Sequence, residues 1–119
     1  MAGPETRFTV LFFTDIVGST DLKARHGVPA YRAALQTHNG HFERLAGECR
    51  GIRILQNVGD GYFAEGESVA EVMKFALLFQ DAMRAGPWPD GLALTTRAGI
   101  HTGEVSALDA EGGSGSSPA

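Results

Sequence analysis

The stretch Arg7-Phe-Thr-Val-Leu-Phe-Phe-Thr-Asp-Ile16 decides how the rest of the chain is interpreted. It is rich in aromatic and β-branched residues and shows little alternation of apolar and polar positions, which is typical of a strand buried on both faces. We therefore predict a strand over residues 7–16 near the centre of a sheet. Gly18-Ser-Thr-Asp21 follows, where Ser and Thr are suited to cap a helix and Asp21 to lie near its positive end.

Two helical regions are predicted downstream, and both show an apolar stripe at helical spacing. The first is expected in two pieces, a short one after Thr20 and a long one over residues 29–48. The long piece has a stripe at steps of three and four residues, formed by Tyr31, Leu35, His38, Phe42, Leu45 and Cys49. The second helix is predicted over residues 68–84, with a stripe formed by Val69, Val72, Met73, Ala76, Gln80 and Met83.

Three further strands complete the predicted fold. Residues 52–57 and 62–64 flank Gly59-Asp60-Gly61, and Asp-Gly between two short strands indicates a hairpin turn. A last strand is predicted over residues 92–105. The order strand, helix, strand, strand, helix, strand indicates an α+β, ferredoxin-like βαββαβ fold, an antiparallel sheet with helices on one face.

The composition fits one small globular domain. The chain has 119 residues, of which 43% are hydrophobic, and its net charge of -4 argues against a nucleic-acid partner. No apolar run approaches the roughly 20 residues that a membrane-spanning helix needs, and Cys49 as the single cysteine excludes an internal disulfide. We expect a cytoplasmic protein with one domain over residues 1–110 and a flexible Gly/Ser tail over residues 111–119.

Two aspartates occupy positions at which packing of the core does not require a carboxylate. Asp15 ends the apolar first strand, and Asp60 lies in the hairpin turn. In a ferredoxin-like sheet the first strand lies beside the middle hairpin, so the two residues can meet at one edge. Paired carboxylates there would repel each other unless a divalent cation lay between them, and such oxygen ligands suit Mg²⁺ or Mn²⁺.

The segment after Asp15 adds a possible phosphate site. It leads from strand into helix, so its backbone N–H groups could face an anion at the helix N-terminus. Each aspartate alone is more often a helix cap or a turn residue, so the prediction of phosphoryl-transfer chemistry depends on their combination with the flanking residues.

Three segments resemble the catalytic domain of class III adenylate and guanylate cyclases. Phe13–Thr20 is similar to the first metal-binding motif of that family, Asn57–Ala64 to the second, and Arg97–Val105 to the strand after the third helix. The three occur in the order of the family and with similar spacing.

The resemblance implies a function and a role for each matching residue. Asp15, Asp60 and the carbonyl of Ile16 would hold two Mg²⁺ or Mn²⁺ ions, and the N–H groups of Gly18, Ser19 and Thr20 would bind phosphates. The reaction would convert a nucleoside triphosphate, ATP or GTP, into a 3′,5′-cyclic nucleotide and pyrophosphate, with cAMP the favoured product. The family acts in intracellular signalling and forms its active sites between two subunits, so a homodimer is expected.

Two features depart from the family pattern. Gln56 stands where the family places the residue that specifies the purine, and its amide can both donate and accept, so base choice stays open. The family's later Asn and Arg have no counterpart, because the only asparagines are Asn39 and Asn57 and no arginine follows Arg97. Losing one such donor typically costs a factor of about 10² to 10³ in rate, so the resemblance implies a truncated domain that is inactive alone.

Two other functions remain open at this point. One is a non-catalytic, cyclase-like regulatory or nucleotide-binding module, which the missing Asn and Arg favour. The other is a ferredoxin-like domain used only for protein interaction, which would leave both aspartate motifs without a role.

Overall fold

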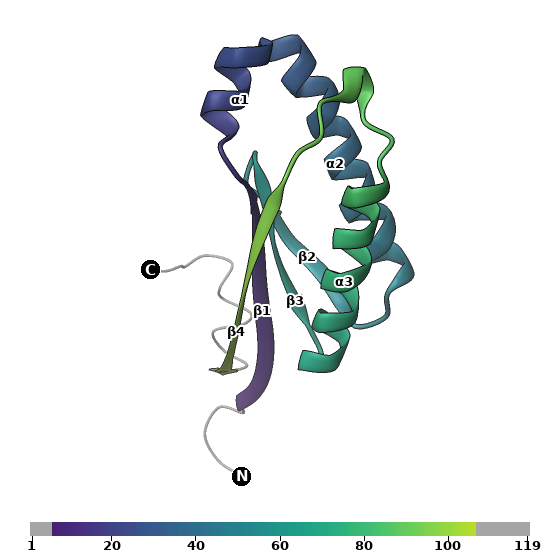
Figure 1. The fold of residues 1–119 in the computed structure, drawn as a ribbon. Coiled ribbons are helices and arrows are strands. Elements are labelled where there is room, and N and C mark those ends of the chain that lie inside the picture. The colour runs from purple at the N-terminus through teal and green to yellow at the C-terminus, as the bar shows by residue number, and fades with distance from the viewer. Residues whose placement is uncertain (1–5, 107–119) are drawn as a thin grey trace.

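The computed structural model describes residues 6–106 of the chain. The elements, drawn in Figure 1, are β1 (Thr6–Ile16), α1 (Ser19–His26), α2 (Val28–Glu48), β2 (Ile52–Asn57), β3 (Gly61–Gly66), α3 (Val69–Ala85), the 3-10 turn η1 (Pro89–Gly91) and β4 (Thr96–Ser106). The predicted tail over residues 111–119 and the predicted domain end at residue 110 lie outside the described residues.

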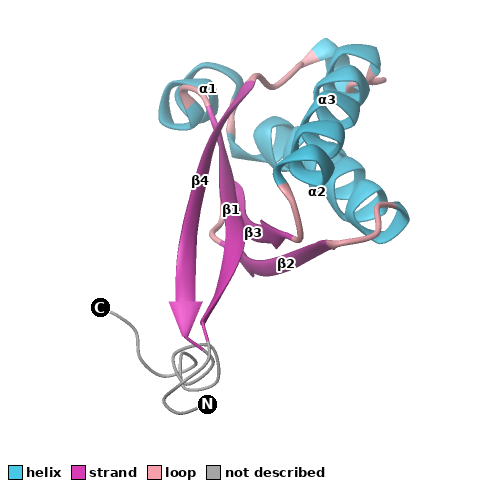
Figure 2. Cartoon of the chain, turned by 90° about the horizontal axis from the view of Figure 1, so that it is seen from below, coloured by secondary structure: helices cyan, strands magenta, loops and turns pink. Residues whose placement is uncertain are grey.

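The described strands form one antiparallel sheet in the order β2-β3-β1-β4. β1 is an inner strand between β3 and β4, as its apolar sequence predicts. The predicted burial on both faces is wrong, because the helices cover only one face and Phe13 on the other is 49% exposed. Helices α2 and α3 lie on the same side of the sheet, while α1 lies at the end where β1 finishes (Figures 1 and 2). The predicted ferredoxin-like fold with helices on one face is therefore confirmed.

The core lies between the sheet and the two long helices and consists mainly of aromatic rings. Phe12 on β1 contacts Phe42 on α2 and Phe75 on α3, with ring centroids 6.3 Å and 5.4 Å away. Tyr62 on β3 stacks on Phe42 at 4.1 Å. These contacts bury large apolar areas and fix how the helices lie on the sheet.

On α2 the predicted stripe is buried, except that Leu35 is only partly buried and Ala34 is buried beside it, whereas on α3 the buried face differs from the prediction. On α2 the buried side chains belong to Tyr31, Ala34, His38, Phe42 and Leu45. On α3 they belong to Val72, Phe75, Phe79 and Met83, whereas Val69 and Met73 are 47% and 44% exposed. Apolar residues surround most of α3, so periodicity alone does not select the face that packs.

The last strand begins later than predicted. Residues 92–95 precede β4, which starts at Thr96. Leu92 and Leu94 are nevertheless buried and belong to the core. An extended segment that alternates buried and exposed side chains has the sequence pattern of a strand whether or not it pairs with a neighbour.

Candidate active site

The end of β1 meets the tip of the β2–β3 hairpin, as the sequence predicts for Asp15 and Asp60. Asp15 pairs with Gly61 in the β1–β3 register. The Ile16 N–H donates a hydrogen bond of 2.9 Å to the carbonyl oxygen of Asp60. Asp15 on β1 and Asp60 in the hairpin turn therefore lie at the same end of the sheet, which we call the acidic edge.

The turn that carries Asp60 is held by local hydrogen bonds. The Asn57 side-chain oxygen accepts a bond of 2.8 Å from the Gly59 N–H, and the Val58 N–H donates to the Gly61 carbonyl at 2.9 Å. Gly59 has a φ of 96°, a conformation that glycine adopts without a steric penalty. The Asn-Val-Gly-Asp-Gly sequence thus forms a tight turn that presents Asp60 beside β1.

The start of α1 is joined to the acidic edge through Ser19. Its hydroxyl donates a hydrogen bond of 3.3 Å to the Asp60 carboxylate, so the segment predicted to bind phosphate contacts a residue predicted to bind metal. The helix cap differs from the prediction: the N-cap residue is Gly18, in the left-handed region at φ 69°, and no side chain caps the helix. Ser19 is the first helical residue and not the N-cap. Its hydroxyl therefore forms a tertiary contact with Asp60 in place of a helix cap.

Arg97 holds the other carboxylate of the acidic edge. It lies on β4 directly opposite Asp15 in the β1–β4 register. Its Nε and Nη2 donate to the two Asp15 carboxylate oxygens at 2.8 Å and 3.2 Å, and this contact raises the pKa of the Arg97 guanidinium. No functional role is predicted for Arg97 from the sequence, because only strand register places it beside Asp15.

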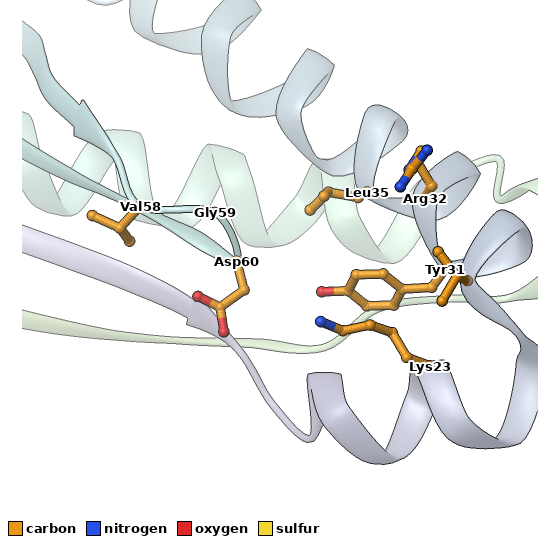
Figure 3. A pocket seen from close by; sticks show the side chains of 8 residues that line it. Lys23, Tyr31, Arg32, Leu35, Val58, Gly59 and Asp60 are labelled. Atoms are coloured by element: carbon orange, nitrogen blue, oxygen red, sulfur yellow. The ribbon is translucent and has the colours of Figure 1, made fainter.

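A pocket of about 560 Å³ lies beside Asp60, between α1, α2 and the hairpin tip. Figure 3 shows the Tyr31 hydroxyl and the Lys23 ammonium both directed toward Asp60. The Lys23 Nζ lies 5.3 Å from the centroid of the Tyr31 ring. From the sequence, Tyr31 is predicted only as part of the helix stripe and Lys23 has no predicted role, since the pocket forms only when α1 packs on α2.

Tyr31 is buried, and among the described residues none forms a hydrogen bond with its hydroxyl. Ser19 lies near the Tyr31 hydroxyl without reaching hydrogen-bonding geometry. Burial raises the pKa of Tyr31, and the nearby Asp60 charge raises it further. The hydroxyl therefore keeps its proton at neutral pH and faces the acidic edge as a donor.

Gln56, the predicted base-specifying residue, lies on the edge strand β2 and is exposed. It pairs with Phe63 on β3 after an irregularity in register at Ile54. The structure thus brings Asp15, Ile16, Ser19 and Asp60 together, and it places Gln56 further back along the hairpin.

The donor chemistry of the acidic edge fits hard divalent cations. Over residues 6–106, no group of three or more His, Cys, Asp or Glu side chains is placed to hold a metal ion. A cation at this edge would therefore use the two carboxylates together with backbone, phosphate or water oxygens. Such an oxygen-only set suits Mg²⁺ or Mn²⁺, which usually retain water and bind through one or two carboxylates plus substrate phosphates.

Residues 3–110 match the family described as the Adenylate and Guanylate cyclase catalytic domain. The comparison with curated proteins gives no significant match. Among the helices of residues 6–106, none has both the length and the apolar character needed to cross a membrane.

Several solved cyclase domains share the fold at low sequence identity. The guanylyl cyclase domain of the RhoGC fusion protein from the aquatic fungus Blastocladiella emersonii gives a TM-score of 0.75 at 18% identity over 88% of this chain and 66% of that one. The guanylate cyclase domain of RhGC from Catenaria anguillulae, in complex with GTP, gives 0.72 at 20% identity over 84% of this chain and 59% of that one. A bacterial light-regulated adenylyl cyclase gives 0.73 at 16% identity over 85% of this chain and 56% of that one.

The chain thus spans less than two thirds of the length of each of these structures. The family match covers most of the sequence, and the fold agrees with it. The chain belongs to the family of adenylate and guanylate cyclase catalytic domains.

Proposed function

We propose that this chain supplies the metal-binding half of a nucleotide cyclase active site. The reaction would form a 3′,5′-cyclic nucleotide and pyrophosphate from a nucleoside triphosphate, with ATP and cAMP as the expected pair, in intracellular signalling. The observation that carries this proposal is the meeting of Asp15 and Asp60 at one end of the sheet, where α1 begins. The family match supports the reaction class.

Asp15, Asp60 and the carbonyl of Ile16 would hold two Mg²⁺ or Mn²⁺ ions at the acidic edge. Bound there, the ions would lower the pKa of the ribose 3′-hydroxyl and neutralise charge on the departing pyrophosphate. The chain's own contribution is positional. The Ile16–Asp60 backbone bond and the Ser19–Asp60 side-chain bond hold Asp60 in place before any ligand arrives.

The start of α1 would bind the phosphate oxygens. The first N–H groups of a helix have no partner within the helix, and the helix dipole places partial positive charge there. Gly18 turns the chain so that residues 18–20 follow directly after the acidic edge. We propose that the N–H groups of Gly18, Ser19 and Thr20 bind the β- and γ-phosphates.

A second copy of the chain would dock on the sheet face away from the helices. Phe13 and Asp15 alternate with the buried residues Phe12 and Ile16 along β1, so they lie on that open face. Phe13 is 49% exposed there. An exposed aromatic ring two residues from the acidic edge favours a protein partner over solvent, and we propose a homodimer.

The chain by itself is expected to bind metal and nucleotide weakly and to show no significant turnover. No asparagine follows Asn57 and no arginine follows Arg97 in this sequence. The charge that develops on the phosphate during reaction would therefore lack the donors that the family supplies. Cyclic nucleotide formed by the pure chain at a rate typical of the family would contradict this part of the proposal.

A thermal melt tests the proposal directly. The chain is heated with Mn²⁺ alone, with each of ATP, GTP, CTP and UTP alone, and with metal and nucleotide together. Asp60→Ala is measured beside Asp81→Ala, a matched control because Asp81 is an exposed aspartate on α3 paired with Arg84. We expect a rise in Tm that needs both metal and nucleotide, persists in Asp81→Ala and disappears in Asp60→Ala.

The nucleotide series also separates the candidate substrates. A larger rise with ATP than with GTP would support cAMP as the product, and the reverse order would support cGMP. If no nucleotide raises the Tm in the presence of Mn²⁺, the chain lacks the proposed binding half of the site.

A further inference from the structure

We propose that Arg97 is an internal counter-cation that occupies Asp15 and must be displaced when a divalent metal ion binds there. This inference rests on the proposed role of Asp15 as a metal ligand. It adds a residue that sets the metal affinity of the chain. Arg97 and the metal ion would bind the same carboxylate oxygens of Asp15.

The contact between the two side chains uses both oxygens of the carboxylate. Nε of Arg97 donates to Oδ1 of Asp15 at 2.8 Å, and Nη2 donates to Oδ2 at 3.2 Å. This two-point geometry is the arrangement in which a guanidinium binds a carboxylate most specifically. It is also built into the fold, because Arg97 faces Asp15 across the β1–β4 ladder.

The charge balance of the acidic edge explains why a cation belongs there. Asp15 and Asp60 are brought to the same end of the sheet by the β1–β3 register and the Ile16–Asp60 bond. Two carboxylates at the same end of the sheet concentrate negative charge there, and a neighbouring positive charge offsets it. Arg97 is the only lysine or arginine of β4 and supplies that charge to Asp15 when no metal is bound.

The exposure of the pair makes exchange feasible without unfolding. The Arg97 side chain is 72% exposed and that of Asp15 is 32% exposed. Exposed ion pairs are weakened by water and salt, and the long arginine side chain can rotate into solvent. A metal ion that takes an Asp15 oxygen would repel the guanidinium at that short range, so binding of one cation opposes binding of the other.

The test measures Mn²⁺ binding to the full 119-residue chain without nucleotide, by the loss of the free Mn²⁺ signal in electron paramagnetic resonance. Arg97→Gln removes the charge and should tighten the Kd roughly tenfold, as expected for loss of one short-range repulsion. Arg97→Lys keeps the charge but not the two-point contact, and should tighten the Kd by a smaller factor. Circular dichroism of both variants checks that the fold is retained.

Arg53→Gln is the matched control. Arg53 forms a similar pair with Glu65 on β3, and Glu65 lies opposite Leu11, four residues from Asp15 along β1. The control changes the net charge by the same amount but leaves the Arg97–Asp15 contact intact. It should therefore leave the Kd for Mn²⁺ unchanged. Adding Asp15→Asn to Arg97→Gln should abolish the gain.

Three results would each overturn the proposed displacement of Arg97. Equal or weaker Mn²⁺ binding by Arg97→Gln, with a wild-type chain that binds Mn²⁺, would overturn the displacement and leave the metal site standing. A gain in Arg53→Gln as large as in Arg97→Gln would reduce the effect to net charge and also overturn it. No Mn²⁺ binding by any variant, including Arg97→Gln, would overturn this inference, whereas the proposed function is decided by the melt with metal and nucleotide together.

Discussion

The Ile16 N–H donates a hydrogen bond of 2.9 Å to the carbonyl oxygen of Asp60 and so fastens the hairpin tip to the end of β1. The next pair along supports it, since the Tyr62 N–H donates to the Thr14 hydroxyl at 3.3 Å. Both aspartates of the acidic edge are therefore held by backbone that is already paired. Some substitutions near these bonds should change the free energy of unfolding, and others should change ligand binding.

Gly18 should be sensitive to replacement because of its backbone conformation alone. It has a φ of 69°, and an added Cβ would meet no atom within 4 Å. Gly18→Ala should therefore lower the free energy of unfolding by about 1 kcal/mol through left-handed strain. Gly18→Asn should cost less, because asparagine adopts this conformation more readily. Urea denaturation measures both, and equal losses in the two variants would argue against the backbone explanation.

The Tyr62 hydroxyl should contribute to stability through its bond to α2. The hydroxyl donates to a Glu43 carboxylate oxygen at 2.5 Å, while the ring stacks on Phe42. Burial raises the pKa of Tyr62, and the bond to Glu43 raises it further, so the hydroxyl stays a donor. Tyr62→Phe keeps the ring and should lower the free energy of unfolding by about 1 to 2 kcal/mol in urea denaturation.

Tyr31→Phe is the control for that experiment. The Tyr31 hydroxyl is also buried, but no described residue forms a hydrogen bond with it. Its removal should change the free energy of unfolding by less than about 0.5 kcal/mol. A loss in Tyr31→Phe equal to that in Tyr62→Phe would show that the Glu43 bond is not the cause.

Stability should fall as the pH drops below the ordinary pKa of histidine. His38 is fully buried between Tyr62 and Phe79, and burial lowers its pKa, partly offset by a 2.8 Å contact with Asn39. Between its lowered folded pKa and about 6.5, the unfolded chain binds more protons than the folded chain, so acid favours unfolding. His38→Gln should therefore flatten the dependence of Tm on pH below that value.

The exposed His26, at the end of α1, provides the comparison for the acid experiment. His26→Gln removes an exposed imidazole and so controls for the loss of a histidine as such. His41 contributes in the same direction as His38, since burial also lowers its pKa. A wild-type Tm that stays constant from pH 7 to pH 5 would contradict the assignment of a neutral, buried His38.

Gln56 should influence which nucleotide stabilises the chain. Gln56→Lys places a pure donor at this position and should favour ATP, whereas Gln56→Glu places a pure acceptor there and should favour GTP. One reversed hydrogen bond corresponds to roughly a tenfold change in relative affinity. Titration of each nucleotide with Mn²⁺ measures the ratio, and Gln36→Lys on the exposed side of α2 is the control. An unchanged ratio in both Gln56 variants would remove Gln56 from base selection.

The sequence by itself determined those features that depend on local pattern. The continuous apolar run predicted β1 as an inner strand, although the helices cover only one of its two faces and Phe13 is 49% exposed on the other. The Asp-Gly turn predicted the hairpin, and the spacing of Tyr31, His38 and Phe42 predicted the buried side of α2. The placing of Asp15 beside the hairpin followed from the expected order of strands.

Only the tertiary structure decided the features that depend on which surfaces meet. The buried face of α3 could not be read from its periodicity, because the helix is apolar on several sides and packing against the sheet selected Phe75 and Phe79. Arg97 reached Asp15 through the β1–β4 register, which joins residues 82 positions apart. The sequence specifies local conformation through periodicity and turn chemistry, but contacts between distant segments depend on register and packing that no local pattern encodes.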